Sequence, residues 1–451
     1  MPLGFDAIQY EVDRLVFRFL KAGAQRLTVS RPANSMLAGL ILWVLPILAL
    51  ADAPAFPRPE LMLPTQSLGP AELAVVVNDR DPLSRRIADY YMGRRAIPVA
   101  NLVHVAFDPG RSVMPVDEFA ALRAEVEQAT PATVQAYALT WAAPYRVGCM
   151  SITTAFAAGY DAAFCAKGCR MTKPSPYYGS DSSRPFDDLG WRPTMALAGT
   201  NFAEVKALID RGVASDGTRP AGTGYLVKTS DAARSVRAAS FDRARSLFGS
   251  AVRLRRIDAD SISGRQDVLF YLTGARQVRE IRANHFLPGA IADHLTSTGG
   301  KLTDSHQMSA LEWLRAGATG SYGTVVEPCN FTSKFPDPVE LIGRYLNGAT
   351  LIEAYWKSVR MPGQGIFIGE PLARPFGGYG VAFDGTRWVM TLYALTPGRY
   401  RLEGAEQPMG PYRPIAGFEK SGAEPVRIRT DPGDPTYFRV VPEAVSGSAS
   451  G

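Results

Sequence analysis

The stretch from Phe286 to Pro375 constrains the fold of this chain more than any other. It opens as FLPGAIADHLTSTGGKL, continues as ALEWLRAGATGSYGTVVEPCN and ends as LIGRYLNGATLIEAYWKSVRMPGQGIFIGEPLARPF. Apolar runs of strand length alternate here with segments of helical periodicity, which is the pattern of βαβ units. We therefore predict strand, helix, strand, helix and strand in one parallel sheet, with strands near Ala290, Gly320 and Phe367.

The segment ELAVVVNDRDPLSRRIADYYMGRRAIPVANLVHVAF predicts an earlier βαβ unit. Asn78 and Asp79 end its first strand, and Asp231 follows a later strand, GYLVKTSD. Open α/β sheets bind ligands beyond the carboxyl ends of their strands, so we expect these three residues to face one crevice. The alternative is that Asn and Asp only end strands and cap helices. His104 lies inside the second apolar strand and is predicted to be a core histidine.

Changes in the residue pattern along the chain divide it into successive parts. An α/β domain, a parallel sheet with flanking helices, is predicted over 71–376, with an irregular Cys-containing insertion at 148–193. Short alternating strands separated by Pro and Gly predict a small β-sandwich over 377–442. A Pro-rich linker is expected at 54–70 and a flexible tail at 443–451.

Residues 1–53 are predicted to be a signal peptide with a long basic n-region. The apolar run MLAGLILWVLPILALA is short and broken by Pro46, and Ala49 and Ala51 offer a cleavage site. The alternative is an uncleaved membrane anchor, for which about 16 apolar residues are barely long enough. Either interpretation predicts an exported protein of the periplasm or the cell surface, with no integral membrane domain beyond the leader.

Export changes the interpretation of the cysteines. The chain has four of them, and an even number in an oxidising compartment favours disulfides. Cys165 and Cys169 lie four apart in FCAKGC, and we predict that they pair with each other, although other pairings with Cys149 or Cys329 remain open. A Cys-x3-Cys spacing with no histidine nearby is a poor zinc site, so no metal is predicted.

Composition excludes several classes of function. With 46% apolar and 20% charged residues, the chain is globular rather than disordered. Its formal net charge of +6 is spread over 451 residues, and no cluster of Lys and Arg interleaved with aromatic residues stands out. We therefore predict no nucleic-acid partner. No motif indicates a cofactor, and none is predicted.

Catalysis, if present, is predicted at the ends of neighbouring strands. His294 lies near the end of the strand AIADH and Cys329 just after the strand GSYGTVVEP, so the two could meet as base and nucleophile. The alternative gives Cys329 to a disulfide and His294 to a hydrogen bond with Asp293 or Asp304. Asp293, Asp304 and Glu327 could instead supply a carboxylate pair or bind a hard cation.

Several phrases carry a resemblance to a known family. They are ELAVVVNDRDPLSRRIADYYMGRRAIP, LTWAAPYRV, FLPGAIADHLTSTGG, GATGSYGTVVEPC and GATLIEAYWKSVRMPGQGIFIGEPLARPF. These phrases resemble a family of exported bacterial proteins that occur in genomes also carrying exosortase. The resemblance covers nearly all of the chain after the leader. It implies export and an exosortase-associated context, and it implies no particular activity.

A second resemblance concerns GATGSYGTV, YLNGATLIEAYW and FIGEPLARP. These runs are similar to the closing part of gingipain-type cysteine peptidases, which implies a caspase-like α/β fold followed by an immunoglobulin-like domain. The resemblance places the peptidase His-Gly at Thr273-Gly274 and the peptidase Cys near Asp293-His294, so the dyad is not retained. It favours a non-peptidase relative that binds a polypeptide or a cell-envelope component. The alternatives are a hydrolase using His294 and Cys329, and a structural envelope protein recruited by its sandwich.

Overall fold

The computed structural model describes residues 57–443, except 65–66, 167, 396 and 423. By its internal contacts the chain divides into Met1–Ala53 and Pro54–Gly451, and every described residue belongs to the second unit. The predicted signal peptide and the tail from residue 444 onward therefore lie outside the described residues. Among the helices that are described, none is long and apolar enough to cross a membrane.

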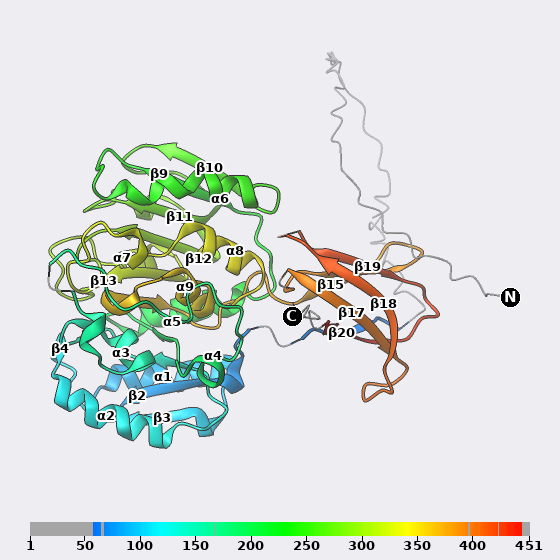
Figure 1. Cartoon of the computed structure of the whole chain (residues 1–451), viewed down its shortest axis with the longest axis horizontal. Helices are drawn as coiled ribbons and strands as arrows, with labels where there is room; N and C mark the ends of the chain where they lie inside the picture. Colours follow the sequence, from blue (N-terminus) through cyan, green and yellow to red (C-terminus); the bar gives the residue numbers. More distant parts are fainter. Residues whose placement is uncertain (1–56, 65–66, 167, 396, 423, 444–451) are drawn as a thin grey trace, which may run out of the picture. The chain divides into compact units, whose positions relative to one another are not determined.

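A ten-stranded sheet forms the centre of the α/β domain (Figure 1). Its strands lie in the order β10-β9-β11-β12-β13-β14-β8-β5-β2-β3. In chain order they are β2 (Leu73–Asn78), β3 (Leu102–Val105), β5 (Ala136–Leu139), β8 (Thr194–Ala196), β9 (Thr223–Lys228), β10 (Arg253–Asp258), β11 (Val268–Gly274), β12 (Phe286–Leu295), β13 (Gly320–Thr324) and β14 (Gly365–Gly369). Strands such as LAVVVN of β2 are buried on both faces, which requires apolar residues at consecutive positions.

The sheet consists of two parallel halves that run in opposite directions. β10, β9, β11, β12 and β13 are mutually parallel, as are β14, β8, β5, β2 and β3. β13 and β14 pair antiparallel. The three strands predicted near Ala290, Gly320 and Phe367 are present, but the prediction that all three are parallel is wrong for the last one.

The connection between β13 and β14 explains this reversal. It contains two helices, α8 (Pro338–Leu346) and α9 (Leu351–Ser358), where a parallel crossover has one. The backbone N–H of Asp337, which caps the start of α8, donates to the carbonyl of Ser358 at the end of α9. The two helices therefore run antiparallel, and the chain enters β14 from the edge at which β13 ends.

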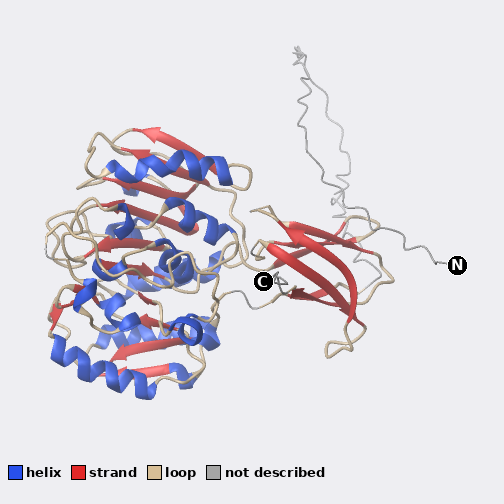
Figure 2. Ribbon diagram, viewed as in Figure 1, coloured by secondary structure: helices blue, strands red, loops and turns tan. Residues whose placement is uncertain are grey.

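Helices cover both faces of the sheet (Figure 2). One face packs against α1 (Pro82–Arg95), α5 (Phe202–Ser215), α6 (Phe241–Phe248), α8 and α9, and the other against α2 (Val116–Ala129), α3 (Ile152–Ala158) and α7 (Leu311–Ala316). α4 (Pro185–Leu189) lies in the insertion. The short 3-10 helices are η1 (Pro70–Glu72), η2 (Val99–Asn101), η3 (Ala162–Phe164), η4 (Ser235–Ser240), η5 (Ile281–Ala283), η6 (Thr332–Lys334) and η7 (Pro362–Gln364).

Two disulfides hold the insertion, and the predicted pairing of Cys165 with Cys169 is wrong. Cys149 bonds to Cys165, and Cys169 bonds to Cys329, 160 residues away. The first bond closes the start of the insertion on itself, and the second ties it to the segment after β13. Cys149 lies between β6 (Arg146–Val147) and β7 (Met150–Ser151), which form a short sheet with β4 (Val113–Met114).

The last described strands form two further sheets with a shared apolar core. One contains β15 (Tyr379–Phe383), β16 (Trp388–Leu392) and β19 (Val426–Thr430). The other contains β1 (Glu60–Met62), β20 (Tyr437–Pro442), β17 (Gly398–Ala405) and β18 (Arg413–Lys420). β1 pairs parallel with β20, so part of the segment expected to be a linker at 54–70 is a strand of this sheet.

Candidate functional site

His294 is buried next to the carboxyl end of β12, and both of its ring nitrogens are occupied. Trp313 Nε1 donates to His294 Nδ1 at 2.9 Å, and since an indole N–H can only donate, Nδ1 carries no proton. Nε2 lies 3.2 Å from the carbonyl oxygen of Met308, to which it donates. Burial lowers the pKa of His294 to about 3, so the ring is neutral. Because both nitrogens are engaged, the ring has no free lone pair with which to act as a general base.

Asp293 lies on the opposite face of β12, where it forms a buried ion pair with Arg237 of η4. Asp293 Oδ1 and Arg237 Nη2 are 2.5 Å apart, and the same nitrogen donates to the carbonyl of Thr273 at 2.8 Å. Burial raises the pKa of Asp293, and the guanidinium opposes that rise. The pair joins the carboxyl ends of β11 and β12 to η4, and removing either partner would leave a buried charge.

Cys329 is not available as a nucleophile, because its sulfur is bonded to Cys169. Its backbone N–H donates to Glu327 Oε1 at 2.8 Å, so Glu327 holds the loop that presents the disulfide. His294 and Cys329 bond to different partners, and the structure does not bring them together as a dyad. The four cysteines of the chain all lie in the two disulfides.

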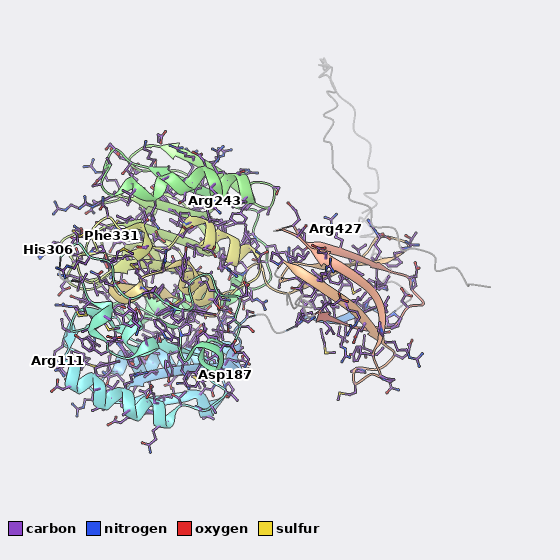
Figure 3. The ribbon with its side chains drawn as sticks, in the orientation of Figure 1. Arg111, Asp187, Arg243, His306, Phe331 and Arg427 are labelled. Carbon is purple, nitrogen blue, oxygen red and sulfur yellow. A yellow bond between two sulfur atoms is a disulfide. The ribbon has the colours of Figure 1, made fainter. Side chains whose placement is uncertain are left out.

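Asp304 lies in the exposed loop between β12 and α7 and contacts the segments that precede β4 and β6. Its Oδ1 accepts from Tyr145 Oη at 2.6 Å and its Oδ2 from Ser112 Oγ at 3.0 Å. Burial, followed by the bond to Asp304, raises the pKa of Tyr145 to about 12. His306, two residues further on, is exposed (Figure 3). Among the described residues no group of three or more His, Cys, Asp or Glu is placed to hold a metal ion.

Asn78, Asp79 and Asp231 do not share a crevice. Asn78 is buried, and its side-chain amide exchanges two hydrogen bonds with the backbone of Phe107. Asp79 contacts His104 Nδ1 at 2.9 Å on the surface. The prediction of a core histidine is therefore wrong, because β3 is an edge strand of the sheet. Asp231 pairs with Arg234 after β9. Because the two half-sheets run oppositely, β2 and β9 end at opposite edges.

A cavity of about 690 Å³ is lined by the two segments that leave the carboxyl ends of β11 and β12 and by α7. Its lining is predominantly polar and includes both Arg and Glu side chains. Arg282 pairs with Glu312 at 2.8 Å, and Arg315 pairs with the same carboxylate at 2.5 Å. The lining residues are Gln277, Val278, Arg279, Glu280, Ile281, Arg282, Leu302, Thr303, Ser305, Gln307, Met308, Ser309, Glu312 and Arg315.

A second cavity, of about 420 Å³, adjoins the first because Arg282 and Arg315 line both. It lies between α5 and α7, and most of its lining is apolar. The lining residues are Ala198, Ala203, Glu204, Ala207, Arg211, Arg282, Leu311, Leu314 and Arg315. Arg211 donates through Nε and Nη2 to the carbonyl of Ala318, which follows α7. Its Nη2 also donates to the carbonyl of Leu314, which lies in the last turn of α7.

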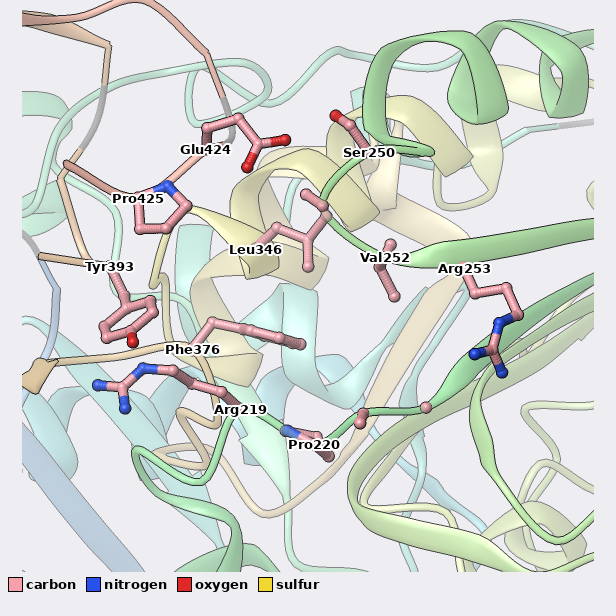
Figure 4. A pocket seen from close by; sticks show the side chains of 13 residues that line it. Arg219, Pro220, Ser250, Val252, Arg253, Leu346, Phe376, Tyr393, Glu424 and Pro425 are labelled. Carbon is pink, nitrogen blue, oxygen red and sulfur yellow. The ribbon is translucent and has the colours of Figure 1, made fainter. Parts of the chain in front are cut away.

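A third cavity, of about 410 Å³, is shown in Figure 4. At one end the guanidinium of Arg219 lies 3.3 Å from the centre of the Tyr393 ring, with Phe376 nearby, and Arg253 marks the other end. Burial lowers the pKa of Arg219, and the Tyr393 hydroxyl opposes this. None of the residues singled out in the sequence lies in its lining.

Together, fold and site define a mixed α/β protein with a disulfide-held insertion and with two adjoining cavities, one mainly polar and one mainly apolar. No family model matches the chain, and no curated protein matches it. A solved structure described as "Structure of Protease" is similar, with 8% identity and a TM-score of 0.39 over 81% of this chain and 98% of the other. The complex of the pro- and mature domains of Porphyromonas gingivalis RgpB is also similar, with 8% identity and a TM-score of 0.41 over 79% and 93% of the two chains. Nothing about the chemistry of this chain follows from likenesses of this size.

Sequence reasoning missed the two arginines that matter most in this region. Arg237 lies in the 3-10 helix η4, and its partner Asp293 is 56 residues away in the sequence. Arg211 carried a readable signal: it follows Ala203 and Ala207 at intervals of four residues, so the three share one face of α5. That face lines a cavity only because α7 packs beside it, and the sequence does not predict that α5 and α7 are neighbours.

Proposed function

We propose that this chain is an exported binding protein that holds a polypeptide over the segments leaving β11 and β12. In this proposal the α/β domain is a non-peptidase relative of the caspase-like fold, the carboxyl-terminal strands form an immunoglobulin-like module, and the context is exosortase-associated. A cell-envelope component is the other ligand class that the test below distinguishes.

The observation that carries the proposal is the position of the 690 Å³ cavity. Both segments that line most of it leave the carboxyl ends of parallel strands, where α/β proteins bind their ligands. Its polar side chains and Arg–Glu pairs suit the hydrogen-bonding backbone and mixed side chains of an extended peptide. Two arginines, Arg276 and Arg279, add positive charge at or beside its rim, and neither forms a salt bridge with another described residue.

The state of the sulfur atoms favours binding over cysteine-dependent hydrolysis. A thiolate is the nucleophile in such hydrolases, and the Cys329 sulfur is bonded to Cys169. The neutral ring of His294 would also be unable to accept a proton, because both of its nitrogens are already hydrogen-bonded. The two disulfides suit an oxidising compartment outside the cytoplasm, which supports export.

The test uses the protein secreted into the periplasm and an array of fluorescein-labelled octapeptides of random sequence. Thr303→Trp fills the cavity from its exposed rim, and Thr332→Trp places the same side chain on an exposed surface elsewhere. We expect the first variant to lose binding at least tenfold and the second to bind as the wild type does.

Three outcomes would overturn the proposal. Equal binding by both variants would remove the peptide from this cavity. Binding of isolated peptidoglycan in place of every peptide would assign the other ligand class. Cleavage of the peptides by the wild type, abolished by Cys329→Ser, would restore the hydrolase hypothesis.

A further inference from the structure

Arg211 stands apart from the other arginines of its cavity. Arg315 pairs with Glu204 at 3.1 Å and with Glu312, and Arg282 pairs with Glu312. Arg211 has no carboxylate partner anywhere in the described part of the chain, and its Nη1 makes no hydrogen bond there. Its only partners are carbonyl oxygens at the end of α7, whose partial negative charge compensates a guanidinium incompletely.

The cavity beside Arg211 has the shape of a pocket for one apolar group. Ala207 and Ala203 are both exposed and lie one and two turns before Arg211 on α5, so their methyl groups leave room above the helix. Leu311 and Leu314 supply the facing wall from α7. At about 420 Å³ the cavity is at the lower end of the range for small-molecule sites.

The connection to the larger cavity gives the pocket a direction. Arg282 and Arg315 line both cavities, so a chain lying in the larger one can continue into the smaller one. Arg211 and the alanines of α5 line the smaller cavity but not the larger one. A ligand that passes between the two arginines therefore needs an apolar group with a negative charge at its end.

We infer that Arg211 anchors the carboxyl-terminal carboxylate of a bound polypeptide, whose last, apolar side chain fills the cavity between α5 and α7. This inference rests on the proposed function and adds the end of the peptide that is recognised. A guanidinium with one free nitrogen suits a carboxylate oxygen, and a charge-assisted bond of this kind is stronger than a neutral one.

Electrostatics agrees with the geometry. Burial lowers the pKa of Arg211 to about 10, and no neighbouring charge opposes the effect. The cation is thus held in a site that disfavours its charge, and a carboxylate beside it would supply the missing counter-charge. Arg282 and Arg315 already have carboxylate partners.

The experiment measures fluorescence anisotropy with the full secreted protein and two peptide pools. Both contain amino-terminally fluorescein-labelled hexapeptides whose last two positions are random; one pool ends in free carboxylates and the other in carboxamides. We expect the acid pool to bind at least tenfold more tightly, since one charged hydrogen bond contributes about 1.5–3 kcal/mol and 1.4 kcal/mol is tenfold. Sequencing of the retained acid peptides should show apolar last residues.

Two variants and a control locate the effect. Arg211→Gln should abolish the preference for the acid pool, and Ala207→Trp, which fills the cavity and leaves the bonds of Arg211 in place, should weaken acid binding at least tenfold. Arg243→Gln removes an exposed arginine that lines neither cavity and should keep the preference.

The outcomes separate the two proposals. Equal affinity for acids and amides by the wild type would overturn the carboxylate anchor alone. Binding of neither pool would overturn it together with the proposed function. A preference for acids that survives Ala207→Trp would also overturn it, because the carboxylate would then lie elsewhere.

Discussion

Acidification is expected to destabilise this protein partly through His294. The folded protein holds this side chain neutral with a pKa of about 3, whereas an unfolded chain leaves histidine near its ordinary pKa of about 6.5. Between these two values the unfolded state binds a proton that the folded state does not, so stability falls as the pH falls from 6.5 towards 3. Linkage gives a loss of about 2 kcal/mol from this one residue between pH 7 and pH 5.

The assay is urea unfolding followed by circular dichroism at pH 7, 6 and 5. His294→Gln keeps an acceptor for Trp313 and a donor for Met308 but has no proton to bind in this range, and exposed His306→Gln is the matched control. We expect His294→Gln to lose about 2 kcal/mol less than the wild type between pH 7 and pH 5. An absolute loss at every pH does not affect this comparison. The same pH slope in the wild type and in His294→Gln would refute the neutral, buried histidine.

Two further substitutions test the packing at the carboxyl ends of β11 and β12. Asp293→Asn leaves Arg237 buried without its counter-charge and is expected to lower the free energy of unfolding by about 3–5 kcal/mol, most of which Asp293→Leu with Arg237→Met should recover. Urea titration checks both, and a loss below about 1 kcal/mol for the single variant would contradict the ion pair. Gly274→Ala would place a Cβ 1.8 Å from the carbonyl oxygen of Arg234 and is expected to cost more than about 2 kcal/mol in the same titration. Gly93→Ala in α1, where nothing lies within 4 Å, should instead stabilise by about 0.5–1 kcal/mol, and similar values for the two alanines would show that β11 is not closely covered.

Local sequence patterns were sufficient to predict most strands of the sheet, although not the short β8, and they did not predict the direction of β14. Strands such as β2 and β14 are mostly apolar runs bounded by turn residues, so their positions follow from the local sequence. The direction of β14 depends on whether one helix or two connect it to β13. The break between α8 and α9 is a short Asn-Gly-Ala-Thr turn inside one apolar stretch, and periodicity reads that stretch as a single helix.

The cysteine pairing could not be obtained from spacing. Cys165 and Cys169 are close in sequence, which makes a short loop conceivable, but each is bonded to a more distant cysteine, Cys149 before them and Cys329 after them. Cys329 reaches Cys169 only because the segment after β13 and the insertion come together over the sheet. That proximity is a property of the topology, and no count of residues between cysteines contains it.

The candidate site illustrates the same limit for polar residues. His294, Asp293 and Cys329 attracted attention because their side chains can perform chemistry, and each is engaged by a structural partner: Trp313, Arg237 and Cys169. Those partners lie 19, 56 and 160 residues away, so the sequence gives no indication that these groups are occupied.

Buried polar groups whose partners are all present and those that lack a counter-charge have different consequences for function. A buried polar group that is fully bonded stabilises the fold, and changing it is costly whatever the protein binds. Arg211 is different, because its carbonyl partners hold the side chain in place while its charge remains without a counter-charge in the described part of the chain. A group that is oriented but not neutralised is prepared for a ligand. This contrast favours a binding function near α5 and α7 over catalysis at the end of β12, and the comparison of acid and amide peptides tests it directly.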